Sequence, residues 1–315
     1  INRSISDILN AEINWPFTRA EGSVDAIAGK QLYSFASIAS TLKYIDYDNV
    51  FLMPKDYITN GDFEISGSAS ITNWATISGS PAASSKFGNT LLLTSAKSSQ
   101  EVEDLIVGKS YVILIQTSGA TLTLDVGTSS GGTQTKTTTL TIASGNEVLL
   151  SEVTFTATAT THYVTFTESA GATAYVKLVQ LAENITPIGL KYISYEEYSE
   201  RYRERDSRPD TDKFSDPEFI YTTYNDEIGL SPIPDTSNRT IKFDYYTSNV
   251  DLSAHGDTSI IPTRFESVIN ARAKYYTYMF RSDVQTAQYA LKEYEDGVKR
   301  MRVELINRKN YMRAV

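Results

Sequence analysis

The residue types that most often carry out chemistry in proteins are sparse in this chain of 315 residues. It contains no cysteine, which excludes disulfides, thiolate metal sites and cysteine nucleophiles. His162 and His255 are the only histidines, and a long stretch of sequence separates them. Neither a serine triad nor a histidine-rich metal set can be built from this pair. The sequence therefore offers no nucleophile with a matching base.

Paired carboxylates and glycine-rich turns are the remaining candidates for chemistry. Glu196–Glu197 and Glu103–Asp104 are adjacent pairs, and because adjacent side chains point apart we interpret them as solvated charges. Gly131–Gly132 lies in a polar hairpin rather than between a strand and a helix, where a phosphate-binding loop would lie. Nothing positions the two separated carboxylates of a glycosidase. We predict that the protein is not an enzyme.

A change of composition along the chain indicates what would position any site. Residues 59–182 hold 40 Ser or Thr among 124 residues, but only three of the 21 tyrosines. The flanks hold the other 18 tyrosines and most of the helix-like patterning. We predict a discontinuous domain of residues 1–58 and 183–315, interrupted by an inserted domain of residues 59–182. The predicted fold class is α+β, a helical-bundle and β-meander domain interrupted by an all-β jelly-roll sandwich.

The charge balance limits the partners that the protein can have. The net charge is −9, with five Lys against nine acids in residues 59–182 and 24 bases against 29 acids in the flanks. Gripping DNA needs clustered Lys and Arg, whereas an acidic wall lets DNA slide past without sticking. No apolar run approaches the roughly 20 residues that span a bilayer, and we see no signal peptide. We expect a soluble protein without membrane contact.

The flanks alternate between helix and strand patterns. Ser4 and Asp7 resemble a capping pair for a short N-terminal helix that Trp15–Pro16 ends, and Ser194 with Glu197 resembles another such pair. Residues 23–30 read as a turn. Near-alternating aromatic and β-branched residues predict strands over 31–35 and 42–53, and a three-stranded meander over 217–224, 227–232 and 240–246.

The C-terminal region is predicted to be helical from residue 261 on, with Thr263 and Glu266 as a capping pair and a new helix start at Ser282–Asp283. Apolar residues then recur at spacings of three and four, a 3.5-residue period that indicates a narrow seam. The seam packs either inside the chain's own bundle, which the short connection favours, or against a neighbouring copy. The seam residues are Val284, Leu291, Tyr294, Val298, Met301 and Leu305.

The order of motifs in the flanks resembles that of a known family. The stretch Ile193-Ser194-Tyr195-Glu196-Glu197 opens a helix, the segment 228–234 closes in prolines, Phe243-Asp244-Tyr245-Tyr246 forms an aromatic strand, and Ile261-Pro262 precedes the terminal helices. This order over residues 1–58 and 183–315 resembles the head-to-tail adaptor proteins of short-tailed phages, of the tail tubular protein A type.

This resemblance implies a structural protein of the virion at the head–tail interface. It implies a homo-oligomer, a ring of twelve copies, that joins the portal protein to the tail tube or nozzle protein. DNA would pass through the lumen of the ring without specific binding. The resemblance implies no cofactor for the adaptor domain.

Residues 59–182 resemble a different family. Asn60-Gly61-Asp62-Phe63-Glu64 is followed by Trp74, then by Gly108-Lys109-Ser110-Tyr111 and by the aromatic-valine strand 174–178. These motifs resemble the jelly-roll carbohydrate-binding modules of bacterial glycanases. Short alternating segments such as 121–126, separated by Gly, Ser and Asn turns, also predict a β-sandwich.

The second resemblance implies glycan binding, and together with the adaptor resemblance we expect an outward sandwich domain that contacts tail fibres, other virion proteins or host glycans. Phe63, Trp74, Tyr111 and Tyr175 occupy motif positions that serve the core, which leaves Phe87, Tyr163 and Phe166 as candidate glycan platforms. The family often binds Ca²⁺, for which Asp62 or Glu64 are candidate ligands. The alternative function is a secreted carbohydrate-binding fragment of a glycanase, which leaves the terminal helices unexplained.

Overall fold

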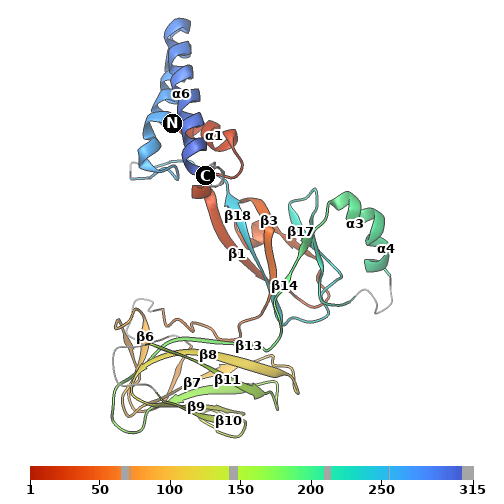
Figure 1. Ribbon diagram of the computed structural model, residues 1–315, viewed down its shortest axis with the longest axis vertical. Coiled ribbons are helices and arrows are strands. Elements are labelled where there is room, and N and C mark those ends of the chain that lie inside the picture. Colours follow the sequence, from red (N-terminus) through yellow and green to blue (C-terminus); the bar gives the residue numbers. More distant parts are fainter. Residues whose placement is uncertain (65–70, 72, 142–147, 209–213, 255, 307–315) are drawn as a thin grey trace, which may run out of the picture. The chain divides into compact units, whose positions relative to one another are not determined.

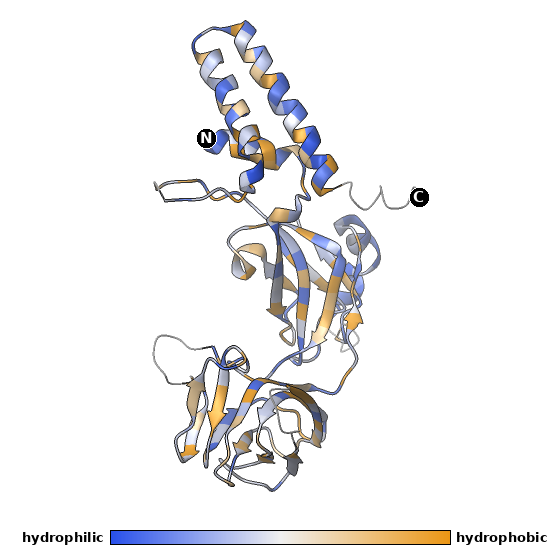
Figure 2. Cartoon of the chain, turned by 60° about the vertical axis from the view of Figure 1, so that its left-hand side comes forward, coloured by the Kyte–Doolittle hydropathy of each residue, from blue (hydrophilic) through white to orange (hydrophobic). Residues whose placement is uncertain are grey.

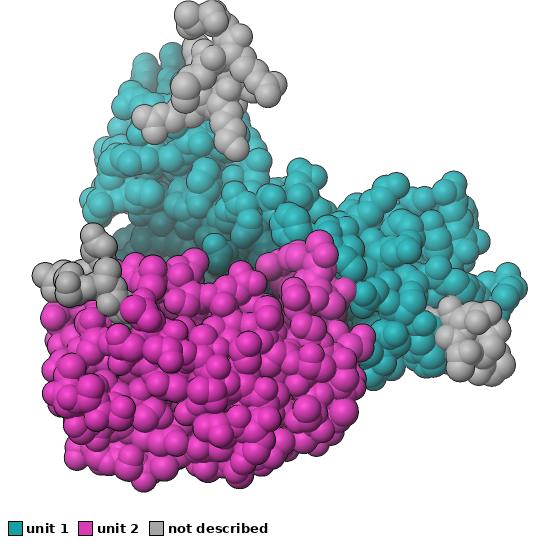
Figure 3. Space-filling model, turned by 60° about the horizontal axis from the view of Figure 1, so that its bottom comes forward, with its two compact units in different colours: residues 1–52, 188–237, 241–315 teal, residues 53–187, 238–240 magenta. Residues whose placement is uncertain are grey.

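A computed structural model describes residues 1–64, 71, 73–141, 148–208, 214–254 and 256–306 (Figure 1). The chain forms two compact units. The helix-and-sheet unit comprises residues 1–52, 188–237 and 241–315, and the sandwich unit comprises residues 53–187 and 238–240 (Figure 3).

Three α-helices share one core in the helix-and-sheet unit. They are α1 (Asn2–Ala11), α5 (Glu266–Phe280) and α6 (Val284–Leu305), with short 3-10 turns at Pro16–Thr18 and Thr263–Phe265. Ile5, Ile8 and Leu9 on α1 are buried with Trp15, whose indole Nε1 donates to the Ile8 carbonyl at 2.9 Å. This bond holds the chain against α1 just after the helix ends.

The predicted helix caps have mixed outcomes. Ser194 accepts a hydrogen bond from the Glu197 amide at 3.1 Å, and Asp283 accepts one from the Thr286 amide, also at 3.1 Å, which confirms both helix starts. The Ser4 cap is wrong, because α1 begins one turn earlier with Ile1 as its N-cap and Ser4 is buried. Thr263 does not cap α5, because it lies inside the 3-10 turn that precedes the helix.

The same unit contains two four-stranded sheets. The first has the order β1-β18-β3-β14 and the second β15-β16-β17-β2. Their core contains Tyr33, Leu52, Ile228, Leu230 and Phe243. The strands are β1 (Arg19–Asp25), β2 (Leu32–Ser34), β3 (Leu42–Pro54), β14 (Ile188–Gly189), β15 (Lys191–Tyr192), β16 (Phe219–Thr222), β17 (Glu227–Ser231) and β18 (Arg239–Thr247), and the short helices are α2 (Phe35–Ile38), α3 (Tyr195–Arg201) and α4 (Arg203–Asp206).

Two strand predictions for this unit need correction. The predicted three-stranded meander is wrong in its third strand. The first two strands, β16 and β17, form an antiparallel hairpin, but β18 lies in the other sheet between β1 and β3. Residues 23–30 are not all turn, since β1 runs to Asp25. The alternation in these segments identified strands but carried no information about which sheet each strand joins.

The sandwich unit contains two five-stranded sheets, which confirms the predicted β-sandwich. Their orders are β10-β9-β12-β7-β4 and β11-β8-β13-β6-β5, and every pair described is antiparallel. The strands are β4 (Ala75–Ser78), β5 (Ala82–Ser84), β6 (Thr90–Leu93), β7 (Lys97–Val102), β8 (Ser110–Gly119), β9 (Leu122–Gly127), β10 (Lys136–Leu140), β11 (Leu149–Thr156), β12 (His162–Thr167) and β13 (Ala174–Glu183).

The core of the sandwich follows from alternation along its strands. On β12, Val164 and Phe166 point into the core, and hydrophobic residues recur at intervals along the other strands (Figure 2). Phe63, Trp74 and Tyr111 belong to this core, as predicted, whereas Tyr175 is half-buried. Phe63, Trp74 and Phe166 form a continuous aromatic cluster with ring centroids 5.3 and 5.7 Å apart.

The insertion of one domain into another stays a prediction, and a deletion can test it. Leu52 and Ile188 are opposed in the antiparallel pair β3–β14, so an Asn-Gly turn can replace residues 53–187. We expect the shortened chain to unfold in one cooperative transition by circular dichroism. A second deletion joined by a long Gly/Ser linker controls for turn geometry. Loss of cooperative folding in both versions would contradict the insertion.

The crossing of α5 and α6 makes a second prediction. A Cβ atom at Gly297 would lie 2.7 Å from Val268 Cγ2, so a larger side chain there must separate the helices. We expect Gly297→Val to lower the free energy of unfolding by about 1–3 kcal/mol in urea. Glu295→Val, at an exposed position of α6, is the control and should cost less than about 1 kcal/mol. Equal stability of the two variants would contradict close packing.

Candidate functional site

A half-buried ion pair between Asp7 and Arg272 joins α1 to α5. Arg272 Nε donates to Asp7 Oδ2 at 2.6 Å, and the Tyr276 hydroxyl donates to the same oxygen. The Arg272 guanidinium also lies 4.8 Å from the centroid of the Tyr294 ring on α6. Burial alone would raise the pKa of Asp7, but the hydrogen bonds from Tyr276 and Arg272 hold it below its usual value. Arg272 of α5 thus contacts both other helices, through Asp7 on α1 and Tyr294 on α6.

Most of the predicted seam lies inside the helix-and-sheet unit. Tyr294, Val298 and Met301 are buried in the core with α1 and α5 residues, and Leu291 and Leu305 are half-buried against that core. These side chains are therefore occupied by the chain's own packing. Val284 is the exception, since its side chain is 54% exposed.

The end of the helical hairpin carries exposed apolar side chains instead. The exposed fractions are 44% for Met279, 91% for Phe280, 54% for Val284 and 69% for Tyr289. Among the described residues at this end, α6 buries only Ala287 and Ala290, and α5 has no buried residue after Ala271. The small alanine side chains let the two helices approach closely, and the larger apolar side chains at this end remain exposed to solvent. Because clustered exposed apolar residues often mark interaction sites, this end is a candidate contact surface.

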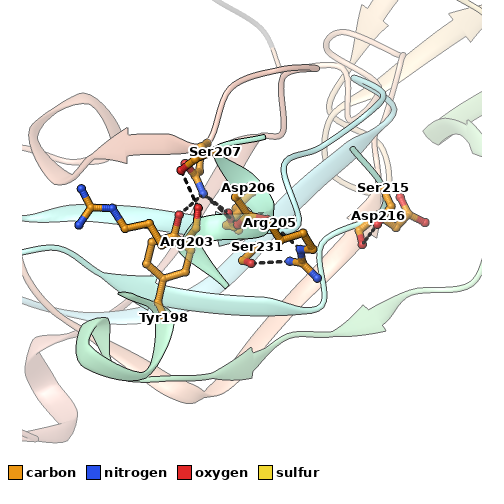
Figure 4. A network of polar contacts seen from close by, with 10 residues as sticks. Tyr198, Arg203, Arg205, Asp206, Ser207, Ser215, Asp216 and Ser231 are labelled. Carbon is orange, nitrogen blue, oxygen red and sulfur yellow. Dashed lines mark hydrogen bonds and ion pairs between the residues drawn. The ribbon is translucent and has the colours of Figure 1, made fainter. Parts of the chain in front are cut away.

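A polar network stabilises the second sheet beside α4 (Figure 4). The buried carboxylate of Asp206 accepts from Arg205 Nε at 3.0 Å and from Gln31 Nε2 at 3.2 Å. Arg205 Nη2 also donates to Ser231 Oγ at 2.8 Å. The pairing of the buried Asp206 carboxylate with Arg205 favours a structural role over a catalytic one.

Tyrosines in the same unit form stacked pairs. Tyr198 on α3 stacks on Tyr221 of β16 with centroids 3.9 Å apart, and Tyr47 stacks on Tyr192 at 4.1 Å. Burial raises the pKa of Tyr47 to about 12, so the phenol stays protonated at neutral pH. The tyrosine-rich composition of the flanks is thus explained largely by packing between sheets and helices.

A pocket of about 400 Å³ lies on the outer face of one sandwich sheet. Tyr163 is opposed to Glu101 across the β12–β7 pair, and its hydroxyl donates to Glu101 Oε1 at 2.7 Å. Thr165 is opposed to Ser99, with their hydroxyl oxygens 3.0 Å apart. The pocket is lined by Asn73, Trp74, Ala75, Ser99, Glu101, Ser130 and Tyr163.

The three candidate glycan platforms have different positions. Tyr163 lies in the pocket and is half-buried. Phe166 is wrong as a platform, because alternation on β12 points its ring into the core, where it is fully buried. Phe87 lies in the turn between β5 and β6, against Tyr175 at 5.7 Å. The sequence reasoning missed Glu101 and Ser99, whose outward alternation on a polar strand was the available signal.

The residues that were considered for chemistry remain apart. His162 is buried on β12, and desolvation lowers its pKa; His255 lies outside the described residues. Asp62 and Glu64 have no further acidic partners: within the described ranges no group of three or more His, Asp or Glu residues could hold a metal ion. A Ca²⁺ ion bound by these two residues stays a prediction. Among the same residues, no helix has the length and apolarity to cross a membrane.

Comparison with known proteins gives one family match and several matches to solved structures. The model of the SU10 adaptor protein family matches residues 135–315. No curated protein matches the sequence.

The chain is similar to three solved structures at low identity. Tailspike protein 4 of bacteriophage CBA120, enzymatically active domain, is 14% identical with a TM-score of 0.34, covering 41% of this chain and 21% of that one. TmCBM61, in complex with beta-1,4-galactotriose, is 16% identical with a TM-score of 0.32, covering 41% and 99%. The CBM22-1 xylan-binding domain from Paenibacillus barcinonensis Xyn10C is 9% identical with a TM-score of 0.32, covering 42% and 97%. The chain thus spans about a fifth of the tailspike domain (21%).

The Asp7 cluster makes a pH prediction. Because the folded-state pKa of Asp7 lies below the unfolded value of about 3.8, its stabilisation is present above that value and is lost as pH falls through the folded pKa. Asp7→Asn should cost about 1–3 kcal/mol at neutral pH and progressively less in acid, measured by urea unfolding. The exposed Asp296, 3.4 Å from Lys299, is the control, and Asp296→Asn should change little. A cost for Asp7→Asn that does not depend on pH would contradict the ionic role.

Proposed function

Because the chain belongs to the SU10 adaptor protein family, we propose that it assembles as the ring that joins the portal of a short-tailed phage to its tail. The family identifies a structural adaptor of the phage virion. The ring, its twelve copies and its place between the portal and the tail tube or nozzle are our proposal. The family match carries the proposal, since it includes both terminal helices and β18.

The charge of the chain supports a role around DNA rather than on it. The net charge is −9, and the acids outnumber the bases in both parts of the sequence. An acidic lumen repels phosphate, so that DNA slides through without being held. We propose that DNA passes through the ring without specific binding.

The exposed end of the α5–α6 hairpin is the surface that we propose for assembly. Phe280 and Tyr289 are large side chains with most of their surface in water, whereas the seam residues Tyr294 and Met301 are not available. Aromatic side chains dominate the energetics of protein interfaces when they enter a partner's pocket. The hairpin end therefore fits contact with a neighbouring copy of the ring.

We propose that the sandwich unit faces outward and contacts a glycan or a tail-fibre protein. Its solvent-facing pocket, lined by Trp74 and Tyr163 together with hydroxyl, amide and carboxylate groups, supports a contact role. The rival function, a secreted carbohydrate-binding fragment of a glycanase, accounts for the sandwich alone. The family match extends through the terminal helices, which that function leaves without a purpose.

Substitutions at the hairpin end test the assembly surface. Phe280→Asp combined with Tyr289→Asp should leave the melting temperature within a few degrees of the wild type, because both side chains are exposed. The double variant should remain monomeric by native mass spectrometry where the wild type forms rings, alone or on the portal protein.

Val303→Asp is the matched control, since Val303 is a 51% exposed apolar residue towards the other end of α6. It should assemble like the wild type. Rings formed by the double variant would refute the proposed surface, and a wild-type chain that forms no ring even with portal protein would refute the adaptor ring itself.

A further inference from the structure

We propose that the exposed end of the α5–α6 hairpin of one copy docks into a hollow on the outer face of the sheet β1-β18-β3-β14 of the next copy. This inference rests on the proposed ring function and adds the surface that receives the hairpin end. A ring of more than two copies joins two different surfaces of each chain, because a patch that pairs with itself closes a two-fold dimer. The hairpin end is one such surface, so the ring needs a second one.

The hollow lies within the helix-and-sheet unit, on the side of the sheet away from the core. Alternation on β18 points Phe243 into the core and leaves Lys242 on the opposite face, which Glu21 of β1 and Phe51 of β3 share. The hollow has a volume of about 510 Å³ and is lined by Glu21, Gly22, Ser23, Asn49, Phe51, Lys242, Phe243 and Asp244.

Phe51 gives the hollow an apolar wall that is open to solvent. Its side chain is 45% exposed, although its neighbours Val50 and Leu52 are buried in the core. Phe51 is opposed to Gly189 on the edge strand β14, and its Cε1 atom lies 4.0 Å from the position of a Cβ atom at Gly189. Since glycine has no side chain to cover the ring, Phe51 stays available to a partner.

Two charges of opposite sign line the same hollow. They are the carboxylate of Glu21 on β1 and the ammonium group of Lys242 on β18. Among the described residues, neither group forms an ion pair or a side-chain hydrogen bond, whereas Asp244 is paired with Arg19. The hollow therefore offers a carboxylate and an ammonium group that a partner can pair.

The hairpin end carries the matching groups. Phe280, at 91%, is the most exposed of the large apolar side chains that the structure describes. Arg281 follows it, is exposed, and forms no ion pair within the described ranges. Asp283 uses its Oδ1 atom to accept from the Thr286 amide, which leaves the second oxygen for a partner.

The two surfaces are thus complementary in shape and charge. Phe280 can pack on Phe51, while Arg281 faces the carboxylate of the hollow and Asp283 faces its ammonium group. An aromatic side chain that enters a partner's pocket supplies most of the energy of an interface, and charges of matching sign around it fix the register.

The hollow of the same chain is out of reach of its own hairpin end. Helix α6 has 22 residues and is roughly 33 Å long at 1.5 Å per residue. Its far end is fixed to α1, where Arg302 Nη2 donates to the Ala11 carbonyl at 2.8 Å. Strand β1, which carries Glu21, follows shortly after α1. The sheet is therefore attached at the end of α6 opposite to Phe280, so we assign the hollow to a neighbouring copy.

Introduced cysteines test the contact directly, because the chain contains none of its own. The full chain with Phe51→Cys and Phe280→Cys, assembled with portal protein and treated with a short bismaleimide, should give a ladder of covalent multimers up to the closed ring on denaturing gels. Leu32→Cys with Phe280→Cys is the matched control, since Leu32 is 38% exposed on β2 of the other sheet. The control should remain monomeric on the same gels.

A charge exchange tests the register of the contact. Glu21→Arg or Arg281→Glu alone should raise the concentration at which half of the chains are assembled at least about tenfold, because like charges then meet at each contact. A chain with both changes should assemble within about threefold of the wild type, measured by native mass spectrometry. Glu200→Arg, at an exposed position of α3, is the control and should assemble like the wild type.

The outcomes separate this inference from the adaptor function. Rings without the Phe51–Phe280 cross-link, or rings that neither charge reversal weakens, would overturn docking into the hollow and leave the adaptor ring standing. A cross-link from Phe51→Cys to the portal protein instead would assign the hollow to that protein and also overturn it. If the wild type forms no ring even with portal protein, the ring is refuted; cross-linked dimers of the cysteine pair would still support the contact between copies, and their absence would overturn it.

Discussion

Buried aromatic side chains that carry a polar atom must find a hydrogen-bond partner inside the protein, and the loops of both units are placed to provide one. Trp15 donates to the Ile8 carbonyl and returns the chain to α1. The Tyr111 hydroxyl accepts from the Ile106 amide at 2.8 Å and fixes the turn before β8. In the second sheet, the Tyr33 hydroxyl accepts from the Ile27 amide at 2.9 Å. Each ring therefore packs a core and also fixes the loop that leads to it.

The two units use the same residue types for different purposes. In the helix-and-sheet unit, tyrosines stack on one another or around Arg272, and exposed apolar side chains gather at the end of the α5–α6 hairpin. In the sandwich unit, aromatic residues fill the core, and Tyr163 borders the outer pocket together with Trp74, beside Glu101 and Ser99.

Sequence patterns predicted elements better than they predicted partners. The seam of α6 was recognised from its 3.5-residue period, but the same period fits an internal bundle and a contact between copies equally well. The burial of Tyr294, Val298 and Met301 with α1 shows which side chains the chain itself covers. For the pocket, Tyr163 was found as an aromatic residue outside the known core motifs. Phe166 looked equivalent, although the two positions lie three residues apart and on opposite faces of β12.

The sequence by itself determined the separate composition of the middle segment, its β-sandwich class, the start of α6 at Asp283 and the absence of cysteine chemistry. These properties are local, since composition, alternation and capping depend on residues that are close along the chain. Only the tertiary structure decided that β18 pairs with β1 and β3, that Ser99 and Glu101 meet Thr165 and Tyr163, and that Asp125 continues their row. Strand partners and the face of a sheet are set by contacts between distant residues, and a shift of one position would have sent Tyr163 into the core.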